Sequence, residues 1–449
     1  MTNNTQMILF LMAGGLLFTG SFASPSLTAQ TPAAATKAEA GQKKDAPDPK
    51  VLETQRQERL RNAYEQANAA IREKQYPKAL SALETVEKNL IERDAYDHLM
   101  RIGHTLRNIP EQTWKDKARE YYAKALARAK DDAGKKASAL TSTASLQSLE
   151  EAEKTIQPIL KGAEFTPQQK YNAQMEVLKR EPSQASFEKA CREKLLPIAG
   201  KNPDLLHSVY QAMSSRYVWS DRDHAIELIE ECLKNPAMSG PAKVRTLWVL
   251  ADYTLDKDAK RKILKPVLEM QDLSPAQRRD TLTRLAKIEL TPEKYMSSPT
   301  PDEYRSALAY CFEILKLKKE PQTNNYLLMS EIYLGLDDPE NAGRYAQEVL
   351  DMKNVHPQNA YKAWEILGDC ARKRGESVKA SKAYRKATEL SNDRDILLLE
   401  KLAKIQMSLR EYPAVLETLE KMKKAPGRYD RRRLIDSYID NVKKRMAQQ

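Results

Sequence analysis

An all-α solenoid of stacked antiparallel helix pairs is the fold class that this sequence predicts, and three observations predict it. Of the 449 residues only 14 are glycine and 7% are aromatic, while the apolar residues are mainly alanine and leucine within charged sequence, which suits helices. After residue 54 no stretch alternates apolar and polar residues at period two, so we expect essentially no sheet. A short helical signature also recurs about every 37 residues. Together they favour one elongated array of repeats over two or three compact domains.

The N-terminus carries the pattern of an export signal. An apolar run of twelve residues, Met7 to Phe18, is followed by Ser21-Phe22-Ala23, whose small first and third residues match a signal-peptidase site. We therefore predict a signal peptide over residues 1–23, cleaved near Ala23 or alternatively at Ala29, and a periplasmic or extracellular protein. The run is shorter than the ~20 apolar residues that span a bilayer, so retention as a membrane anchor is the weaker alternative.

A linker is predicted to follow the signal. Residues 24–54 are rich in Ala, Pro, Thr, Lys and Gln up to Lys50 and contain few large apolar side chains. Such a segment buries too little apolar surface to offset the entropy of ordering, so we expect it to be disordered.

The repeat is found by a signature in which a small residue is followed by apolar residues four and seven positions later. These offsets place all three on one helical face, and the small first residue lets a neighbouring helix approach. The signatures begin at Ala79, Ala118, Ala152, Ala225, Ala307, Ala342, Ala380 and Val415. Two of the gaps, 73 and 82 residues, are about two periods and leave room for degenerate units near Phe187 and Ile263.

Each unit is expected to be a pair of helices. A second amphipathic segment lies upstream of each signature, best seen at Tyr361 to Arg374. One such helix cannot bury its apolar face alone, so successive pairs must stack into a continuous core. We predict about ten such units over residues 55–425.

A basic amphipathic helix is predicted to cap the array over residues 426–449. Pro426-Gly427 ends the last pair and Asp430 is a candidate N-cap. The stripe at helical spacing behind it would cover the exposed core of the last repeat, as solenoids require; it consists of Leu434, Ile435, Tyr438, Ile439, Val442 and Met446.

The formal net charge of +12 is concentrated at this end of the chain. Residues 421–449 hold ten Lys or Arg against three Asp, and the rest of the chain is mixed in sign. The basic patch Arg431, Arg432 and Arg433 is either a solvated face of the capping helix or a surface that docks on anionic envelope material. Nucleic acid is the least favoured partner, because no aromatic residues interleave the cluster for base stacking.

Catalytic and cofactor motifs are absent from the sequence. The five histidines, at 98, 104, 207, 224 and 356, show no pairing typical of metal ligands. Glycine-rich nucleotide-binding loops and the nucleophile motif of serine hydrolases are also missing. We therefore predict no metal, no cofactor, no small-molecule substrate and no enzymatic activity.

The four cysteines are spread over different repeats. They lie at 191, 232, 311 and 370, without a C-x-x-C motif. Cys232 and Cys311 occupy core positions of the signature, where cysteine behaves as a small apolar residue. We expect buried free thiols, with a Cys191–Cys232 disulfide between neighbouring units as the alternative.

Residues 361–394 resemble the tetratricopeptide repeat. Trp364, Leu367 and Gly368 match the family's W-x2-L-G, and Ala380, Tyr384 and Ala387 match its later small, aromatic and small positions. Ala371 and Asn392 replace the family's usual Tyr and Pro. The units at 323–356 and 396–429 match well and the unit at 60–93 partly, whereas residues 130–300 match by period and second-helix pattern. The resemblance implies a right-handed superhelix.

The resemblance also implies a groove lined by the first helix of each pair. Carried over by position, the groove residues are Asn324, Leu327, Glu331, Leu334, Lys362, Glu365, Asp369, Arg372, Glu400, Lys404 and Met407. Mixed charges at these positions favour a protein surface or peptide over an acidic C-terminal tail. The sequence thus predicts an exported scaffold or adaptor that binds protein in this groove. The alternative is a structural protein that binds anionic envelope polymer or lipid through its basic C-terminal helix.

Overall fold

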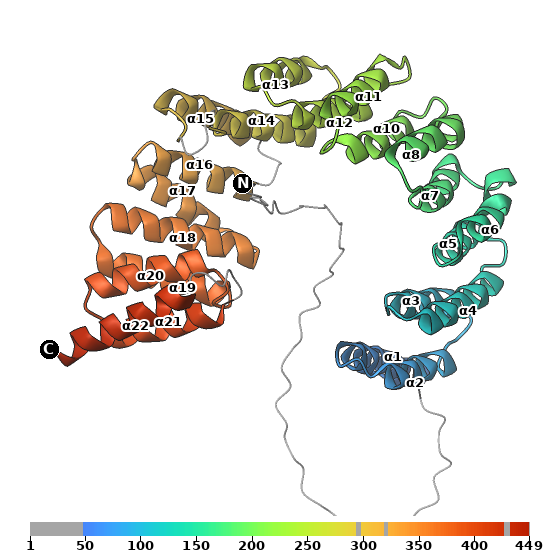
Figure 1. Ribbon diagram of the computed structural model, residues 1–449, viewed down its shortest axis with the longest axis horizontal. Helices are drawn as coiled ribbons and strands as arrows, with labels where there is room; N and C mark the ends of the chain where they lie inside the picture. Colours follow the sequence, from blue (N-terminus) through green and yellow to red (C-terminus); the bar gives the residue numbers. More distant parts are fainter. Residues whose placement is uncertain (1–47, 293–297, 318–321, 426–431, 449) are drawn as a thin grey trace, which may run out of the picture.

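The computed structural model describes residues 48–292, 298–317, 322–425 and 432–448, and for 432–434 it describes only the backbone. Every regular element in these ranges is a helix, and the helices follow one another along an open arc (Figure 1). The predicted signal peptide, residues 24–47 of the predicted linker, and the predicted Pro426-Gly427 break with the Asp430 cap lie outside the described residues.

Ten successive helix pairs form the described part of the arc, and consecutive pairs pack against each other. The pairs are α1 (Pro49–Arg72) with α2 (Tyr76–Lys88), α3 (Ala95–Arg107) with α4 (Gln112–Arg128), α5 (Ala133–Ala144) with α6 (Leu149–Lys161), α7 (Pro167–Leu178) with α8 (Gln184–Ala190), η1 (Cys191–Leu195) and α9 (Leu196–Ala199), α10 (Pro203–Tyr217) with α11 (Arg222–Lys234), α12 (Gly240–Tyr253) with α13 (Lys257–Leu264) and η2 (Lys265–Glu269), α14 (Pro275–Glu289) with α15 (Pro301–Leu315), α16 (Thr323–Gly335) with α17 (Pro339–Asp351), α18 (Pro357–Lys373) with α19 (Ser377–Leu390), and α20 (Ile396–Ser408) with α21 (Tyr412–Lys424). The last helix is α22 (Arg432–Ala447). This confirms the predicted number of units.

The first helix begins earlier than the sequence pattern predicts. Helix α1 starts at Pro49, within the segment that we expected to be linker up to residue 54. The Asp48 carboxylate accepts a hydrogen bond from Lys50 N at 2.8 Å, and proline is well suited to the first turn of a helix. Val51 and Leu52 remain exposed, so this turn lacks the buried stripe on which the prediction relied.

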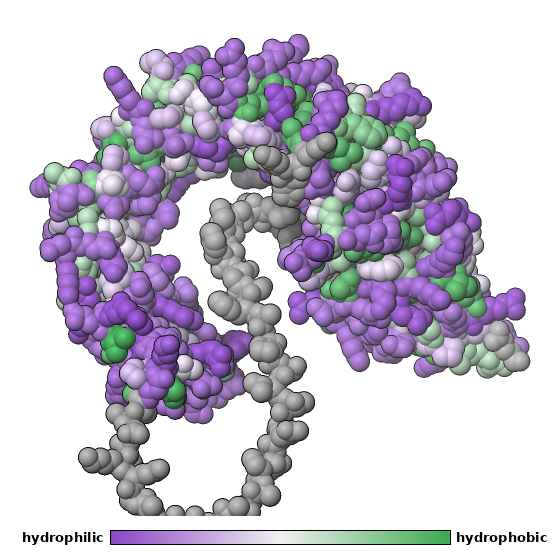
Figure 2. Space-filling view, turned by 180° about the vertical axis from the view of Figure 1, so that it is seen from behind, coloured by the Kyte–Doolittle hydropathy of each residue, from purple (hydrophilic) through white to green (hydrophobic). Residues whose placement is uncertain are grey.

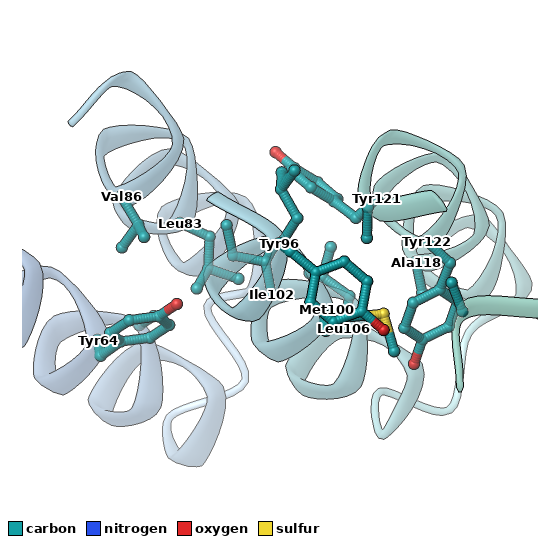
Figure 3. Packing of buried hydrophobic residues seen from close by; sticks show 14 of the residues in the cluster. Tyr64, Leu83, Val86, Tyr96, Met100, Ile102, Leu106, Ala118, Tyr121 and Tyr122 are labelled. Atoms are coloured by element: carbon teal, nitrogen blue, oxygen red, sulfur yellow. The ribbon is translucent and has the colours of Figure 1, made fainter. Parts of the chain in front are cut away.

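The predicted signatures form the core of the second helices. All three residues of all eight signatures are buried, and none is more than 7% exposed. Figure 3 shows how Leu83 and Val86 of α2 and Tyr122 of α4 meet side chains of α1 and α3 in one continuous cluster. Each second helix therefore buries its apolar face against the first helix of its own pair and against the next pair.

The glycine of the family motif is required by close packing within a pair. A Cβ atom on Gly368 of α18 would lie 2.4 Å from the ring of Tyr384 on α19. Gly103 of α3 stands in the same relation to Tyr122 of α4, also at 2.4 Å. A small residue at this position therefore lets the aromatic ring of the second helix lie directly against the first helix.

The two degenerate units lie where the sequence predicts them, and proline interrupts the second helix in both. Phe187 lies in α8 and is buried, and Ile263 lies in α13 and is half-buried. Pro197 follows the π-helical turn η1, and Pro266 lies in the 3-10 turn η2. Because proline cannot donate a backbone hydrogen bond, the α-helical pattern changes at these points.

The first helices lie on the inner side of the arc where Figure 1 shows the arrangement plainly. There α3, α5, α12 and α14 are inner and α4, α6, α11 and α13 are outer. The visible surface in Figure 2 is mostly hydrophilic, with small apolar patches along the arc. A largely hydrophilic exterior therefore surrounds a core that runs between the two layers of helices.

Four first helices end in the same left-handed turn. The residue in this turn is Lys74, Asp337, Gly375 or Arg410, with φ between 58° and 75°. In each case the next backbone N–H bonds to a carbonyl five residues earlier, as in Glu411 N to Gln406 O at 3.0 Å. Only one of the four positions holds the residue that tolerates this conformation without cost.

Replacing Arg410 by glycine should therefore stabilise the fold. The left-handed conformation costs a non-glycine residue about 1–2 kcal/mol, and the greater freedom of glycine in the unfolded chain offsets part of the gain. We expect a net gain of about 0.5–1 kcal/mol in urea unfolding of the full chain. Gly375→Ala is the matched reverse change and should destabilise, and equal shifts for both variants would contradict the account.

A buried histidine makes stability depend on pH. His207 of α10 is 7% exposed and lies 2.8 Å from the hydroxyl of Thr246 on α12. Burial, assisted by Arg245, lowers the pKa of His207 to about 4. The folded chain therefore keeps this ring neutral while the unfolded chain protonates it below about 6.5.

Stability is thus expected to fall as the pH drops from about 6.5 to 4, by up to roughly 3 kcal/mol. Urea unfolding midpoints measured across this range should decline less steeply in a His207→Gln variant, whose amide does not titrate. Parallel declines in both proteins would show that carboxylates alone cause the acid sensitivity.

The last helix covers the apolar end of the array with one of its faces. Ile435, Ile439 and Val442 of α22 are buried against side chains of α20 and α21. Tyr438 and Met446, which we also placed in the covering stripe, are 60% and 40% exposed. The stripe is wider than the surface it covers, so part of it stays open to solvent.

Candidate functional site

The hollows in the described part of the chain include three that are lined partly by first helices. The first, of about 400 Å³, lies between α3 and α5; the second, of about 410 Å³, lies between α12, α13 and α14. The third, of about 470 Å³, lies between α20, α21 and α22. The first helices that line the first two hollows, α3 and α5, and α12 and α14, lie on the inner side of the arc (Figure 1).

The C-terminal hollow is the most apolar of the three. Its walls are Ala403, Met407, Val415, Leu419, Met422, Ile435, Tyr438 and Val442, with Glu400 and Lys404 beside them. Lys404 pairs with Glu400 at 2.7 Å, and its side chain is 75% exposed. Two flexible methionines and an exposed tyrosine make a wall that adapts to an apolar side chain.

The N-terminal hollow combines aromatic and polar groups. His104 accepts or donates at 2.9 Å to the hydroxyl of the buried Tyr122, and burial lowers the pKa of the imidazole. The guanidinium of Arg101 stacks on the ring of Tyr64, 3.8 Å from its centroid. Both polar side chains are therefore held by neighbouring aromatic rings rather than being free in solution.

A network of ion pairs joins α18 to α20. The ammonium group of Lys401 lies 2.8 Å from Glu365 and 2.7 Å from Asp369. Asp369 also accepts a hydrogen bond from the hydroxyl of Tyr384 at 2.7 Å. Burial alone would lower the pKa of Lys401, but the two carboxylates outweigh it and raise the pKa. The carboxylates at two predicted groove positions are thus neutralised within the protein.

Glu331 extends this charged region to α16. Its side chain reaches solvent, yet the surrounding protein desolvates the carboxylate and raises its pKa. Lys362 and Lys287 oppose the shift, whereas Glu365 reinforces it. Charged groups from α14 and α18 therefore lie close enough to Glu331 of α16 to influence its carboxylate.

The structure brings most of the predicted groove residues to the surface. The exposed ones are Asn324, Glu331, Lys362, Arg372 and Lys404, and the half-buried ones are Leu334, Glu365, Asp369, Glu400 and Met407. The prediction for Leu327 is wrong. This residue is 6% exposed and packs in the core with Ala342 of α17 and Ala363 of α18. Burial between these helices is favourable for an apolar side chain, so Leu327 does not face solvent.

Lys401, Tyr438 and Met422 were not predicted as site residues. Lys401 and Glu365 are 36 residues apart, about one repeat. Alignment of successive repeats for opposite charges would have identified this pair. Tyr438 was assigned only to the stripe of the capping helix and Met422 only to the last signature, and the sequence gives no signal that these residues also line a hollow.

The predicted basic patch cannot be placed in the fold. Arg431 lies outside the described residues, and for Arg432 and Arg433 only the helical backbone is described. The envelope-binding role of this patch stays a prediction.

The described ranges provide little for redox or metal chemistry. They contain no group of three or more His, Cys, Asp or Glu arranged to hold a metal ion. All four cysteines are buried free thiols, without a Cys191–Cys232 disulfide, and burial raises the pKa of each. Among the same residues, no helix has the length and apolar content needed to cross a bilayer.

Comparison with known proteins gives a partial match to a curated protein. No family model matches the chain. Over 97 residues it is 34% identical to a curated protein described as "Tetratricopeptide repeat protein 21 homolog" of Caenorhabditis briggsae. The match covers 22% of this chain and spans only 7% of that protein's length.

Solved structures of low sequence identity also align with the chain. A human IFIT1 dimer with m7Gppp-AAAA is 15% identical, covers 89% of this chain and 88% of its own, and has a TM-score of 0.40. Yeast Tom70 is 11% identical over 87% and 97% of the two chains, with a TM-score of 0.32. A tetratricopeptide repeat protein from Parabacteroides merdae is 14% identical over 70% and 99%, with a TM-score of 0.32.

Proposed function

We propose, from the premise that this chain is a tetratricopeptide-repeat solenoid, that it is an exported, non-enzymatic scaffold or adaptor that binds protein partners through its first-helix surface. A scaffold fold of this kind suggests protein–protein interaction. Export is proposed from the apolar run and cleavage pattern at Met7 to Ala23, which lie outside the described residues.

The apolar hollow between α20, α21 and α22 carries this proposal. Its walls include Met407, a position that the family resemblance places in the groove, and the exposed Tyr438. A hollow of about 470 Å³ walled by apolar side chains is suited to an anchoring side chain of a partner. Neighbouring Glu365 and Asp369 are already paired with Lys401, so we expect apolar contact to supply more of the affinity than charge.

Two variants of the hollow test the proposal. The full chain is immobilised, and proteins retained from an envelope extract are identified for the wild type, Met407→Glu and Tyr438→Ser. Tyr438 is 60% exposed, so its replacement leaves the fold intact and guards against misfolding of the other variant.

Lys382→Glu is the matched control, because Lys382 is exposed on the second helix α19. We expect the wild type and the control to capture the same partner. The amount of this partner captured should fall about tenfold or more in both hollow variants. Retention of every captured protein by both hollow variants would contradict the proposal. N-terminal sequencing of the mature protein tests export and should read from Ser24 or a nearby residue.

A further inference from the structure

A fourth hollow lies at the edge of the solenoid, away from the three described above. It has a volume of about 820 Å³ and forms where α18 begins, α19 ends and α20 begins. Its lining residues are His356, Pro357, Gln358, Tyr361, Leu390, Ser391, Arg394, Asp395, Ile396 and Leu397. It shares no lining residue with the hollow between α20, α21 and α22.

Exposed leucines form the wall of this edge pocket. Leu397 is 60% exposed and Leu390 is 38% exposed, and Ile396 and the ring of Tyr361 lie beside them. Large apolar side chains gathered around a hollow indicate a binding site more strongly than single exposed ones do. The pocket therefore suits an aliphatic side chain of a partner.

The charges at the pocket favour an anion. Among the described residues, the guanidinium of Arg394 has no hydrogen-bond acceptor or ion-pair partner, although its backbone N–H bonds to Ser391 O. The Asp395 carboxylate is engaged, because it accepts from Leu397 N at 2.9 Å, from Leu398 N at 3.2 Å and from the hydroxyl of Tyr361. The cation at the pocket thus lies beside a carboxylate whose oxygens are engaged with the first turn of α20 and with Tyr361.

The helix termini at the pocket leave this cation in place. Helix α18 and helix α20 begin there with partial positive charges, α19 ends there with a partial negative charge, and the Asp395 carboxylate already caps α20. The cap of α18 is His356, which accepts through Nδ1 from Gln358 N at 3.3 Å and brings no carboxylate to that end. The edge pocket thus combines apolar walls with the guanidinium of Arg394, which has no carboxylate partner among the described residues.

We propose that the edge pocket binds an internal acidic segment of a partner polypeptide, with a leucine-like side chain against Leu390 and Leu397 and a neighbouring carboxylate on Arg394. The pairing of apolar wall and cation selects this occupant by charge complementarity. The proposal rests on the proposed protein-binding role but assigns it a second surface, so that one chain holds two partner segments.

Capped peptides provide the test. A fluorescein-labelled ten-residue peptide, acetylated and amidated at its ends, carries two leucines flanked by aspartates. Three further peptides serve for comparison. In the first, serine replaces both leucines; in the second, lysine replaces the aspartates. The third ends in leucine with a free carboxylate. Binding to the full chain is measured by fluorescence anisotropy.

We expect the capped acidic leucine peptide to bind at least about tenfold more tightly than the serine and lysine peptides. Arg394→Gln and Leu397→Ser should each weaken its binding by about fivefold or more. Both positions are exposed, and Lys382→Gln on α19 is the matched surface control. Met407→Glu should leave this peptide's binding unchanged, which separates the edge pocket from the surface of the proposed function.

Equal binding of the acidic and serine peptides, or equal losses with Arg394→Gln and Lys382→Gln, would overturn the proposal. Preference for the peptide with a free terminal carboxylate would overturn the assignment to an internal segment. If the peptide result holds while the hollow variants retain their partners, the edge pocket stands and the proposed function fails.

Discussion

Replacing Tyr384 by alanine is expected to cost about 3–5 kcal/mol of stability in the C-terminal repeats, the range for large buried aromatic side chains. Tyr384 is fully buried against Gly368, and its hydroxyl holds Asp369 in the network with Lys401. The alanine variant leaves a cavity and removes a donor from a partly buried carboxylate. Urea unfolding and hydrogen exchange over residues 357–390 would measure the loss.

The loss should begin locally. Because each repeat contacts only its neighbours, exchange should rise first in α18, α19 and α20 and much less in α1 to α4. Tyr384→Phe removes only the hydroxyl and should cost about 1 kcal/mol. Tyr438→Ala, at a 60% exposed tyrosine, should stay within about 0.5 kcal/mol of wild type. Equal effects at positions 384 and 438 would refute the assignment of Tyr384 to the core.

Replacing Arg261 by methionine is the second change with a large expected effect. Arg261 of α13 binds the carboxylate of Glu289 on α14 through two nitrogens, one of them at 2.9 Å. Glu289 is 5% exposed, so the variant leaves a buried charge without its partner. Breaking such a pair typically costs 3–5 kcal/mol. Thermal and urea unfolding of the full chain would measure the cost.

A double variant distinguishes the loss of the Arg261–Glu289 ion pair from other effects of replacing Arg261. Arg261→Met with Glu289→Leu replaces both charges by apolar groups and should recover much of the loss. Arg305→Met is the exposed control, because Arg305 pairs with Asp302 at 2.6 Å on the surface with its side chain 68% exposed. No recovery in the double variant would mean that Arg261 acts through other contacts.

The repeat array could be predicted from sequence because its determinants are local. The signature residues Ala380, Tyr384 and Ala387 share one face of a single helix, and their burial follows from that spacing. The number of pairs followed from counting such faces along the chain. The interrupted second helices at Phe187 and Ile263 could also be predicted. The gaps of 73 and 82 residues between neighbouring signatures are each about two repeat periods and so leave room for one more unit.

The site was less predictable because it depends on contacts between pairs. Lys401 neutralises Glu365 and Asp369 from the next repeat, and this pairing appears in no single unit. Leu327 occupies a groove position by alignment, but packing between α16 and its neighbours buries it. The hollow beside Met407 depends on how α22 lies against α20 and α21, which the periodicity of the sequence does not specify.

Site-specific photo-crosslinking tests the central claim most directly. A photoreactive residue is placed at Lys362 or Lys404 on first helices, or at Lys382 or Glu420 on second helices, all of them exposed. We predict that one and the same partner protein is crosslinked from positions 362 and 404, is absent from 382 and 420, and is lost from both first-helix positions in Tyr438→Ser. Crosslinking from the second helices alone, or equally from all four positions, would contradict a partner held on the first-helix surface.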